Sequence, residues 1–320
     1  MRKRVLHLIL SAFLCASAIA QREQVFGEAR FVHLPPSHNP APWNAALTEN
    51  LAGSWKNAAE RGVLKGLANR CVSLKSVLLD IAAWDRNGQN SHEVPVWQLP
   101  ESQAFFFVSG MTIDADGAPN AYNPDDTGLD ALANAGAPGD WNGIITDREG
   151  NPLIQQESDP FPGYYISCTS LSDRTKESTD PTVYVDASKI PYVALPQEVA
   201  DRGEARLGDF AVVMNLRNGK SSFAIYADIG TLGEGSVALA DVLGIRSDAR
   251  HGGESDGILY LLFPGSGNLR PRTIGEIESE GENLLQYYWG GIKKLSSCIE
   301  SEDPGNAPKA DFLTDRNLAH

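Results

Sequence analysis

Two carboxylates, Asp228 and Glu234, flank a short glycine-rich turn in the stretch YADIGTLGEGSVALADVLGI. The apolar run before Asp228 predicts a strand that delivers this residue at its C-terminal end. A pair of this kind fits glycoside hydrolysis, because one carboxyl group must protonate the leaving oxygen while the other activates water or attacks the sugar. Spacing alone leaves a second interpretation open, in which Asp228 is a turn residue and Glu234 caps a helix.

The residues after the pair predict a short helix. Ser236 has the N-cap residue type, VALADVL supplies two turns, and Gly244 is a typical stop. A helix N-terminus favours the ionised form of a nearby carboxyl group by a few tenths to about 1 kcal/mol. We therefore expect that Glu234 can act as an acid only if desolvation or a neighbouring carboxylate opposes this effect.

A second group of polar residues, Asp114-Ala115-Asp116-Gly117 with Asn120 close behind, follows an apolar run. D-x-D-G is also the pattern of a tight turn in which Asp side chains accept backbone hydrogen bonds. A calcium loop of the EF-hand type would need a terminal Glu that is missing here. No CxxC or HExxH pattern occurs, so we predict no metal and no cofactor.

Short β-rich runs separated by Gly, Pro, Asn and Asp occupy residues 100–270, which is typical of a β-dominated domain. The predicted strands are 104–113, 164–171, 182–187, 191–195, 209–215, 221–227 and 257–263. Asn218-Gly219 between two of them predicts an antiparallel hairpin. Apolar spacing predicts short helices within about 43–83 and a helix within 282–295.

The ordered motifs FVSGMTIDADGAPNAYNPDDTGLDALANAG, PGYYISCTSL, IPYVALP, YADIGTLGEGSVALADVLGI and GILYLLFPGSG resemble the glycoside hydrolase family 75 chitosanases and their bacterial relatives. The likeness covers roughly residues 100–270. A weaker similarity, in GDFAVV, NGK and the strand ending Asp228-Ile229-Gly230, is to double-psi β-barrels. The fold implied is β-dominated (α+β), with a six-stranded double-psi β-barrel-like catalytic core and peripheral helices.

The resemblance implies roles for the candidate residues. Glu234 would be the general acid and Asp228 the general base of an inverting endo-chitosanase. Asp114 and Asp116, with Asn120 beside them, would bind glucosamine ammonium groups in the cleft. The aromatic residues that could stack on sugar rings are Trp141, Tyr164, Tyr165, Tyr192 and Tyr226, among which Tyr192 is favoured because the family motif includes it.

The ends of the chain predict export. MRKRVLHLILSAFLCASAIA has a basic start, an apolar stretch and a small-residue cleavage site near Ala20. We divide the chain into a signal peptide (1–20), a partly helical extension (21–99), the catalytic domain (100–299) and a flexible tail (300–320). Cys71, Cys168 and Cys298 would remain after cleavage and allow at most one intramolecular disulfide, whose pairing stays open.

The net charge limits which classes of molecule the protein can bind. It is −14 for the whole chain, and removing three basic residues with the signal leaves 24 basic against 41 acidic residues, or −17. Such a surface repels nucleic acid and attracts a cationic polysaccharide such as chitosan. No apolar run suggests a membrane span, and we expect a secreted monomer.

Three other functions compete with this one. A peptidoglycan-cleaving enzyme on the same barrel would need Asp228 alone. A non-catalytic carbohydrate-binding protein would retain the acids as turn residues. An esterase is disfavoured, because Gly265-Ser266-Gly267 lacks the strand-turn-helix setting of a nucleophile elbow.

Overall fold

The computed structural model describes residues 76–84, 91–99 and 102–287. Its main feature is an eight-stranded sheet in the order β1-β2-β3-β10-β7-β8-β6-β9, in which β9 also pairs with β3. The strands are β1 Ser76–Trp84, β2 Ser91–Gln98, β3 Phe105–Asp114, β6 Tyr192–Leu195, β7 Phe210–Asn215, β8 Ser221–Ile229, β9 Glu234–Ser236 and β10 Glu254–Phe263.

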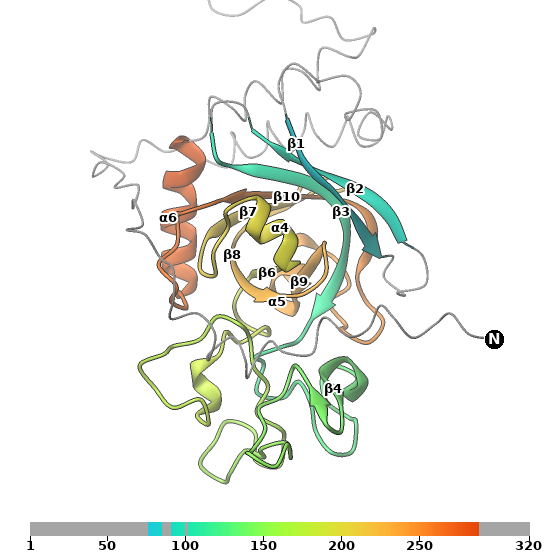
Figure 1. Cartoon of the computed structure of the whole chain (residues 1–320), viewed down its shortest axis with the longest axis vertical. Helices are drawn as coiled ribbons and strands as arrows, with labels where there is room; N and C mark the ends of the chain where they lie inside the picture. Colours follow the sequence, from blue (N-terminus) through green and yellow to red (C-terminus); the bar gives the residue numbers. More distant parts are fainter. Residues whose placement is uncertain (1–75, 85–90, 100–101, 288–320) are drawn as a thin grey trace, which may run out of the picture.

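Because β9 returns to β3, the last six strands of this order close into a barrel (Figure 1). Two contacts in the ring are parallel, β6 with β8 and β3 with β9, and the others are antiparallel. The prediction of a β-dominated fold with a six-stranded barrel core is confirmed.

Two apolar clusters divide the barrel into an inner and an outer face. Alternate residues of β3, β6, β7, β8 and β10 fill the interior of the barrel. There, Phe107 and Tyr260 stack with ring centroids 4.7 Å apart. The residues of opposite parity, such as Phe106 and Val212, belong to a separate outer cluster. Gly235 of β9 lies against Leu239 and Met111 of the interior, so its neighbours Glu234 and Ser236 lie on the outer face.

The local predictions along β7, β8 and the following helix are confirmed. The Asn218-Gly219 turn joins β7 and β8 as an antiparallel hairpin, with Gly219 at φ 78°. Helix α5 (Val237–Leu243) starts at Ser236, whose side chain accepts a hydrogen bond from the Leu239 N–H, and ends at Gly244 with φ 66°. These contacts fix the chain immediately after Glu234.

The helical prediction for 43–83 is wrong over residues 76–83, which form most of β1, and residues 43–75 lie outside the described part. Periodicity alone does not separate a strand from a short buried helix, and pairing with β2 decides for the strand here. Ile81 lies opposite Val94 in this hairpin, and β2 continues onto β3 through Trp97 and Phe106. The hairpin is thus continuous with the barrel sheet.

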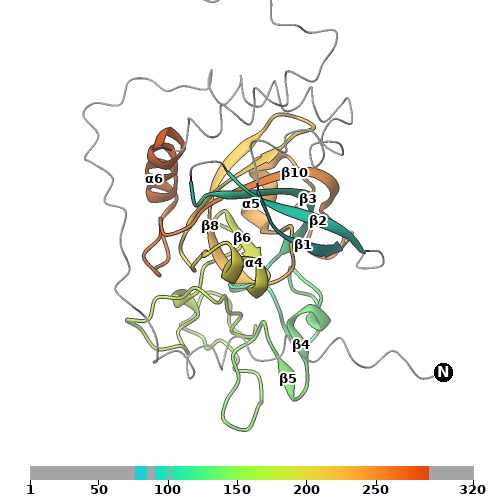
Figure 2. The same ribbon diagram turned by 45° about the horizontal axis from the view of Figure 1, so that its top comes forward.

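A layer of irregular chain, about 115–190, lies against one side of the barrel, as Figures 1 and 2 both show. It holds the short elements η2 Leu132–Ala135, β4 Gly136–Ala137, β5 Asp140–Trp141 and η3 Pro181–Val183. The strands predicted at 164–171 and 182–187 are wrong, because these runs bury their apolar residues against the barrel while forming only isolated bridges, with Tyr165, Ser167 and Tyr184.

The remaining helices are α4 Gln197–Arg202 and α6 Ile274–Tyr287. Helix α6 packs through Ile277 and Leu284 on the outer cluster, and begins earlier than the helix predicted at 282–295. None of the helices in the described ranges is long and apolar enough to cross a bilayer. Cys168 is disulfide-bonded; the other cysteines, the predicted signal peptide and the predicted tail lie outside the described residues.

Candidate active site

Strand register brings Asp228 and Glu234 into one row on the barrel. In β6, Ala194 pairs with Asp228 of β8 on one side and with Glu234 of β9 on the other. Residues aligned across neighbouring strands point to the same face, and two strand spacings place the two Cα atoms roughly 9–10 Å apart. The sequence-predicted pair therefore shares a surface, although five residues separate the two in the chain.

A β-bulge turns Asp228 toward that surface. Val193 pairs with Tyr226, but the next residue, Ala194, pairs with Asp228, so Ala227 is an extra residue on β8. Without it, Asp228 would share the inward parity of Tyr226. Bulges of this kind are known to redirect side chains beside active sites.

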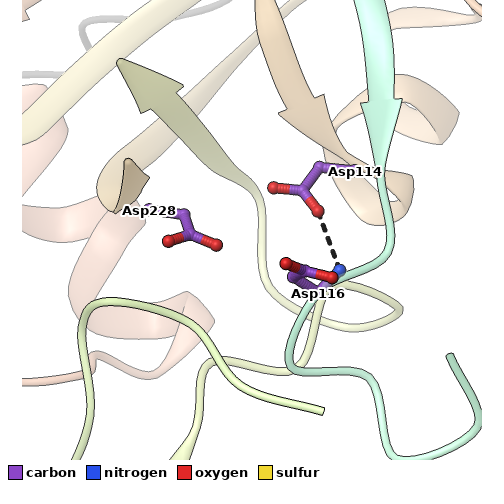
Figure 3. Close-up of side chains that lie close together, drawn as sticks. All are labelled: Asp114, Asp116 and Asp228. Atoms are coloured by element: carbon purple, nitrogen blue, oxygen red, sulfur yellow. Dashed lines mark hydrogen bonds between the residues drawn. The ribbon is translucent and has the colours of Figure 1, made fainter. Parts of the chain in front are cut away.

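Strand β3 adds the second acidic group to the same face. Its Thr112 pairs with Glu234, and Asp114 lies two residues further on, opposite Ser236. Asp116 follows in a turn that the Asp114 carboxylate closes by accepting the Asp116 N–H at 2.8 Å. Asp114, Asp116 and Asp228, here called the carboxylate cluster, each place an oxygen within 4.8 Å of the others (Figure 3).

Asp228 is buried and firmly hydrogen-bonded. Its Oδ1 accepts the Ser170 N–H at 3.0 Å, the Ser170 hydroxyl at 2.6 Å and the Ile229 N–H at 2.8 Å. Burial raises the pKa of Asp228 to about 6, although the three hydrogen bonds act in the opposite direction. A carboxyl group with this pKa is ionised near neutral pH and is basic enough to accept a proton.

Glu234 is partly exposed as a whole residue, but its carboxyl group is buried because the side chain bends back over its turn. Its Oε2 accepts the Thr231 N–H at 2.8 Å and the Thr231 hydroxyl at 3.3 Å. Burial raises the pKa of Glu234 to about 7, helped by the charge of Asp228 and opposed by the Thr231 bonds. Desolvation thus has the largest effect on the pKa of Glu234, as an acid role requires. The N-cap of α5 is Ser236 and not Glu234.

Asp114 and Asp116 hold protons more strongly than ordinary carboxyl groups. Burial raises the pKa of both well above the usual range, and the neighbouring carboxylates raise it further. The Tyr122 hydroxyl donates to Asp116 Oδ1 at 2.6 Å. Three carboxyl groups at this distance cannot all be ionised at neutral pH unless a cation lies among them.

The donor set of the cluster defines what it could bind. All three groups offer carboxylate oxygens, which suit a hard metal ion such as Ca²⁺ or Mg²⁺ and equally an ammonium group. Asn120 is partly exposed in the next turn, where its carbonyl accepts the Leu129 N–H at 3.0 Å. Within residues 102–287, the Asn120 side chain forms no hydrogen bond to an acid of the site.

The stacking role predicted for Tyr192 is wrong. Its side chain is 0% exposed, so no face of the ring can meet a sugar. The hydroxyl instead donates to the Asp116 carbonyl at 3.0 Å and contacts Asp114. Tyr226 is 2% exposed and belongs to the barrel interior. Among the other aromatic residues named, Trp141 and Tyr165 are partly exposed with centroids 6.4 Å apart.

Three residues that contact the acids were not predicted from the sequence. They are Ser170 on Asp228, Thr231 on Glu234 and Tyr122 on Asp116. Ser170 lies in the motif PGYYISCTSL and Thr231 in the turn itself, so position in a motif was the one available signal. Tyr122 also lies in a quoted motif, FVSGMTIDADGAPNAYNPDDTGLDALANAG, but only folding of the 115–130 chain brings its hydroxyl to Asp116.

Comparison with known proteins relates the part of the site around Asp228 and Glu234 to a known family. Residues 154–285 match the family described as fungal chitosanase of glycosyl hydrolase group 75. The match covers 132 of the 320 residues and supports assignment of this region to glycosyl hydrolase group 75. A search of the curated proteins gives no match. The group 75 match includes Asp228 and Glu234 and begins after Asp114 and Asp116, and it supports a chitosanase-type glycoside hydrolase.

Proposed function

We propose that this protein is an endo-acting hydrolase of β-1,4-linked glucosamine polymers, with Glu234 as general acid and Asp228 as general base. The observation that carries the proposal is the shared outer-face row of β8, β6 and β9, on which two carboxyl groups with raised pKa face one surface. The group 75 match over the same strands supports the class of substrate.

The pKa values of Glu234 and Asp228 differ in the direction that the reaction needs. Glu234, with a pKa of about 7, keeps its proton to a higher pH than Asp228, with a pKa of about 6. In the roles that the resemblance to group 75 implies, Glu234 donates its proton to the glycosidic oxygen. Asp228 takes a proton from the water that attacks the anomeric carbon, and the bond to the leaving oxygen breaks. The glycosidic oxygen leaves as a hydroxyl group and the sugar gains the water oxygen.

Strand spacing supports an inverting outcome. Retaining enzymes hold their carboxyl groups about 5–5.5 Å apart, whereas inverting enzymes leave about 6.5–9.5 Å for the water. Two strand spacings hold the two Cα atoms roughly 9–10 Å apart, which leaves room for a water between the two side chains. We therefore propose that the first product carries the inverted anomeric configuration.

The cluster supports selection of deacetylated sugar. An ammonium group beside Asp114 and Asp116 would relieve the repulsion between these two carboxylates, which an N-acetyl group cannot do. The net charge of −14 also raises the rate of encounter with a cationic polymer at low salt. Secretion through the predicted signal peptide, as a monomer, would bring the protein to such a substrate.

The test compares products from chitosans of differing acetylation with those from peptidoglycan. Mass spectrometry should show glucosamine oligomers that become scarcer as acetylation rises, and NMR of the first products should show the α-anomer. Release of fragments from peptidoglycan but not from chitosan would favour a cell-wall enzyme on the same barrel. Saturable binding to chitosan without any products would instead indicate a carbohydrate-binding protein and overturn the proposal.

A further inference from the structure

Ser170 makes two of the three hydrogen bonds to Asp228. Both its N–H and its hydroxyl end on Oδ1, at 3.0 and 2.6 Å, and the Ile229 N–H reaches the same oxygen at 2.8 Å. A carboxylate oxygen has about two lone-pair sites, so three donors saturate Oδ1. The other oxygen, Oδ2, is thereby left to accept a proton.

The segment that carries Ser170 is held on both sides of it. The Leu171 N–H donates to the Ala227 carbonyl at 2.8 Å, which anchors the segment on the bulged residue of β8. The Thr169 hydroxyl donates to the Leu171 carbonyl at 2.7 Å and accepts the Val185 N–H at 3.0 Å. Ser170 is therefore fixed relative to the strand whose last polar side chain it contacts.

The same segment also reaches the turn of Asp116. The Ser167 hydroxyl accepts the Gly117 N–H at 3.0 Å and donates to the Gly143 carbonyl at 3.1 Å. Residues 167–171 thus connect the Asp114-Asp116 turn with the bulge that carries Asp228. Both parts of the carboxylate cluster depend on this one stretch of chain for their placement.

We propose that Ser170 is a positioning residue for the general base, which is an inference that rests on the proposed function. Its hydroxyl stabilises the ionised form of Asp228, because a charge-assisted hydrogen bond favours the charged acceptor. It also fixes the carboxylate plane so that Oδ2 meets the attacking water. Ser170 does not itself contact the reacting atoms.

The test begins with Ser170→Ala, which removes the hydroxyl and keeps the backbone donor. In the full-length protein, the Asp228 carboxyl carbon is followed by NMR as pH is varied, and its titration midpoint should rise by about one pH unit. On chitosan, kcat should fall on the order of ten-fold, with the acidic limb of the pH profile moved upward and KM little changed. An unchanged midpoint would overturn the proposal, whether or not chitosan is a substrate.

Two further variants make the test specific. Ser172→Ala, just after this segment, should leave the midpoint and kcat unchanged, because the hydrogen bonds to Asp228 come from Ser170 and Ile229. Ser170→Thr keeps a hydroxyl and should restore the midpoint toward that of the parent protein. If Ser170→Ala does not fold, Ser170→Cys replaces it, since a thiol has similar size but donates weakly. A shift of the same size in Ser172→Ala, or no restoration by threonine, would contradict the role of the hydroxyl.

Discussion

At the scale of residues, burial raises the pKa of the two acids more than their hydrogen bonds lower it. Asp228 and Glu234 both accept backbone and hydroxyl donors that favour their ionised forms, yet burial raises the pKa of each. The sequence predicted the opposite influence on Glu234, from the helix that starts at Ser236. Burial at Glu234 could not be predicted because it comes from β3 and β6, whose pairings with β9 are not apparent in the sequence.

The pH dependence of catalysis follows from these two groups. The base must be ionised, so kcat/KM should fall as pH drops through about 6, the pKa of Asp228. The acid must be protonated, so kcat/KM should fall as pH rises through about 7, the pKa of Glu234. The expected profile is a bell with its maximum between pH 6 and 7, measured as initial rates on soluble chitosan oligomers. A flat profile between pH 5 and 8 would show that neither group titrates in the reaction.

Gly230 should matter for activity more than for stability. A Cβ at this position would meet Oε2 of Glu234, a movable side-chain end, and the Gly230 backbone does not need a positive φ. Gly230→Ala should therefore displace Glu234 and lower kcat at least ten-fold while changing the melting temperature little. Gly233→Ala is the contrast, because φ is +84° and the Gly110 carbonyl lies 2.7 Å from the new atom. It should lower the melting temperature clearly, and equal effects of both substitutions on stability would refute this distinction.

At the scale of elements, the sequence predicted correctly those features that depend on residues adjacent in the chain. The β7–β8 hairpin, the N-cap at Ser236 and the stop at Gly244 all agree with the structure. Residues 76–83 and 164–171 were assigned wrongly, since pairing with β2 and burial under the loop layer decide their conformations. Strand β9 was missed because it has three residues and no apolar pattern, although it carries Glu234.

The Ser236 hydroxyl connects β9 with the chain entering β6 and with α5, so its removal should lower the stability of the fold. This hydroxyl accepts the Leu239 and Tyr192 N–H groups and donates to the Ile190 carbonyl at 2.8 Å. Ser236→Ala should lower the free energy of unfolding by about 1–3 kcal/mol, because it removes a cap and leaves buried backbone groups unpaired. Val242→Ala on the exposed side of the same helix, where Val242 is 48% exposed, is the control with little expected change. Urea unfolding of both variants measures the difference, and a loss below 0.5 kcal/mol at Ser236 would contradict this role.

At the scale of the whole molecule, buried acids should make the protein less stable as pH rises. Burial raises the pKa of Asp209 and of Asp228 to about 6 and of Glu234 to about 7, above the ordinary values of 3.8 and 4.5. Between these values the folded state binds more protons than the unfolded state. The stability contribution is therefore complete below about pH 4 and is lost as pH rises through 6 and 7.

The melting temperature should accordingly be lower at pH 8 than at pH 5 by several degrees, as measured by calorimetry. The net charge of −14 acts in the same direction through self-repulsion. Glu234→Gln removes one of the buried ionisations, so it should raise the melting temperature at pH 8 and change it little at pH 5. A parent protein that is more stable at pH 8 than at pH 5 would contradict the burial of these acids.

If Glu234 and Asp228 together perform the hydrolysis, removing either carboxyl group should abolish turnover. Turnover of chitosan by purified Glu234→Gln and Asp228→Asn is compared with the parent protein, with Glu198→Gln as a control at an exposed glutamate. Circular dichroism first confirms that all variants are folded. Both site variants should lose at least 99% of turnover, on the order of the 10²–10⁴-fold that general acid–base catalysis contributes, while the control retains it. A folded site variant that keeps more than about a tenth of parent turnover, well above what that loss allows, would contradict the assignment.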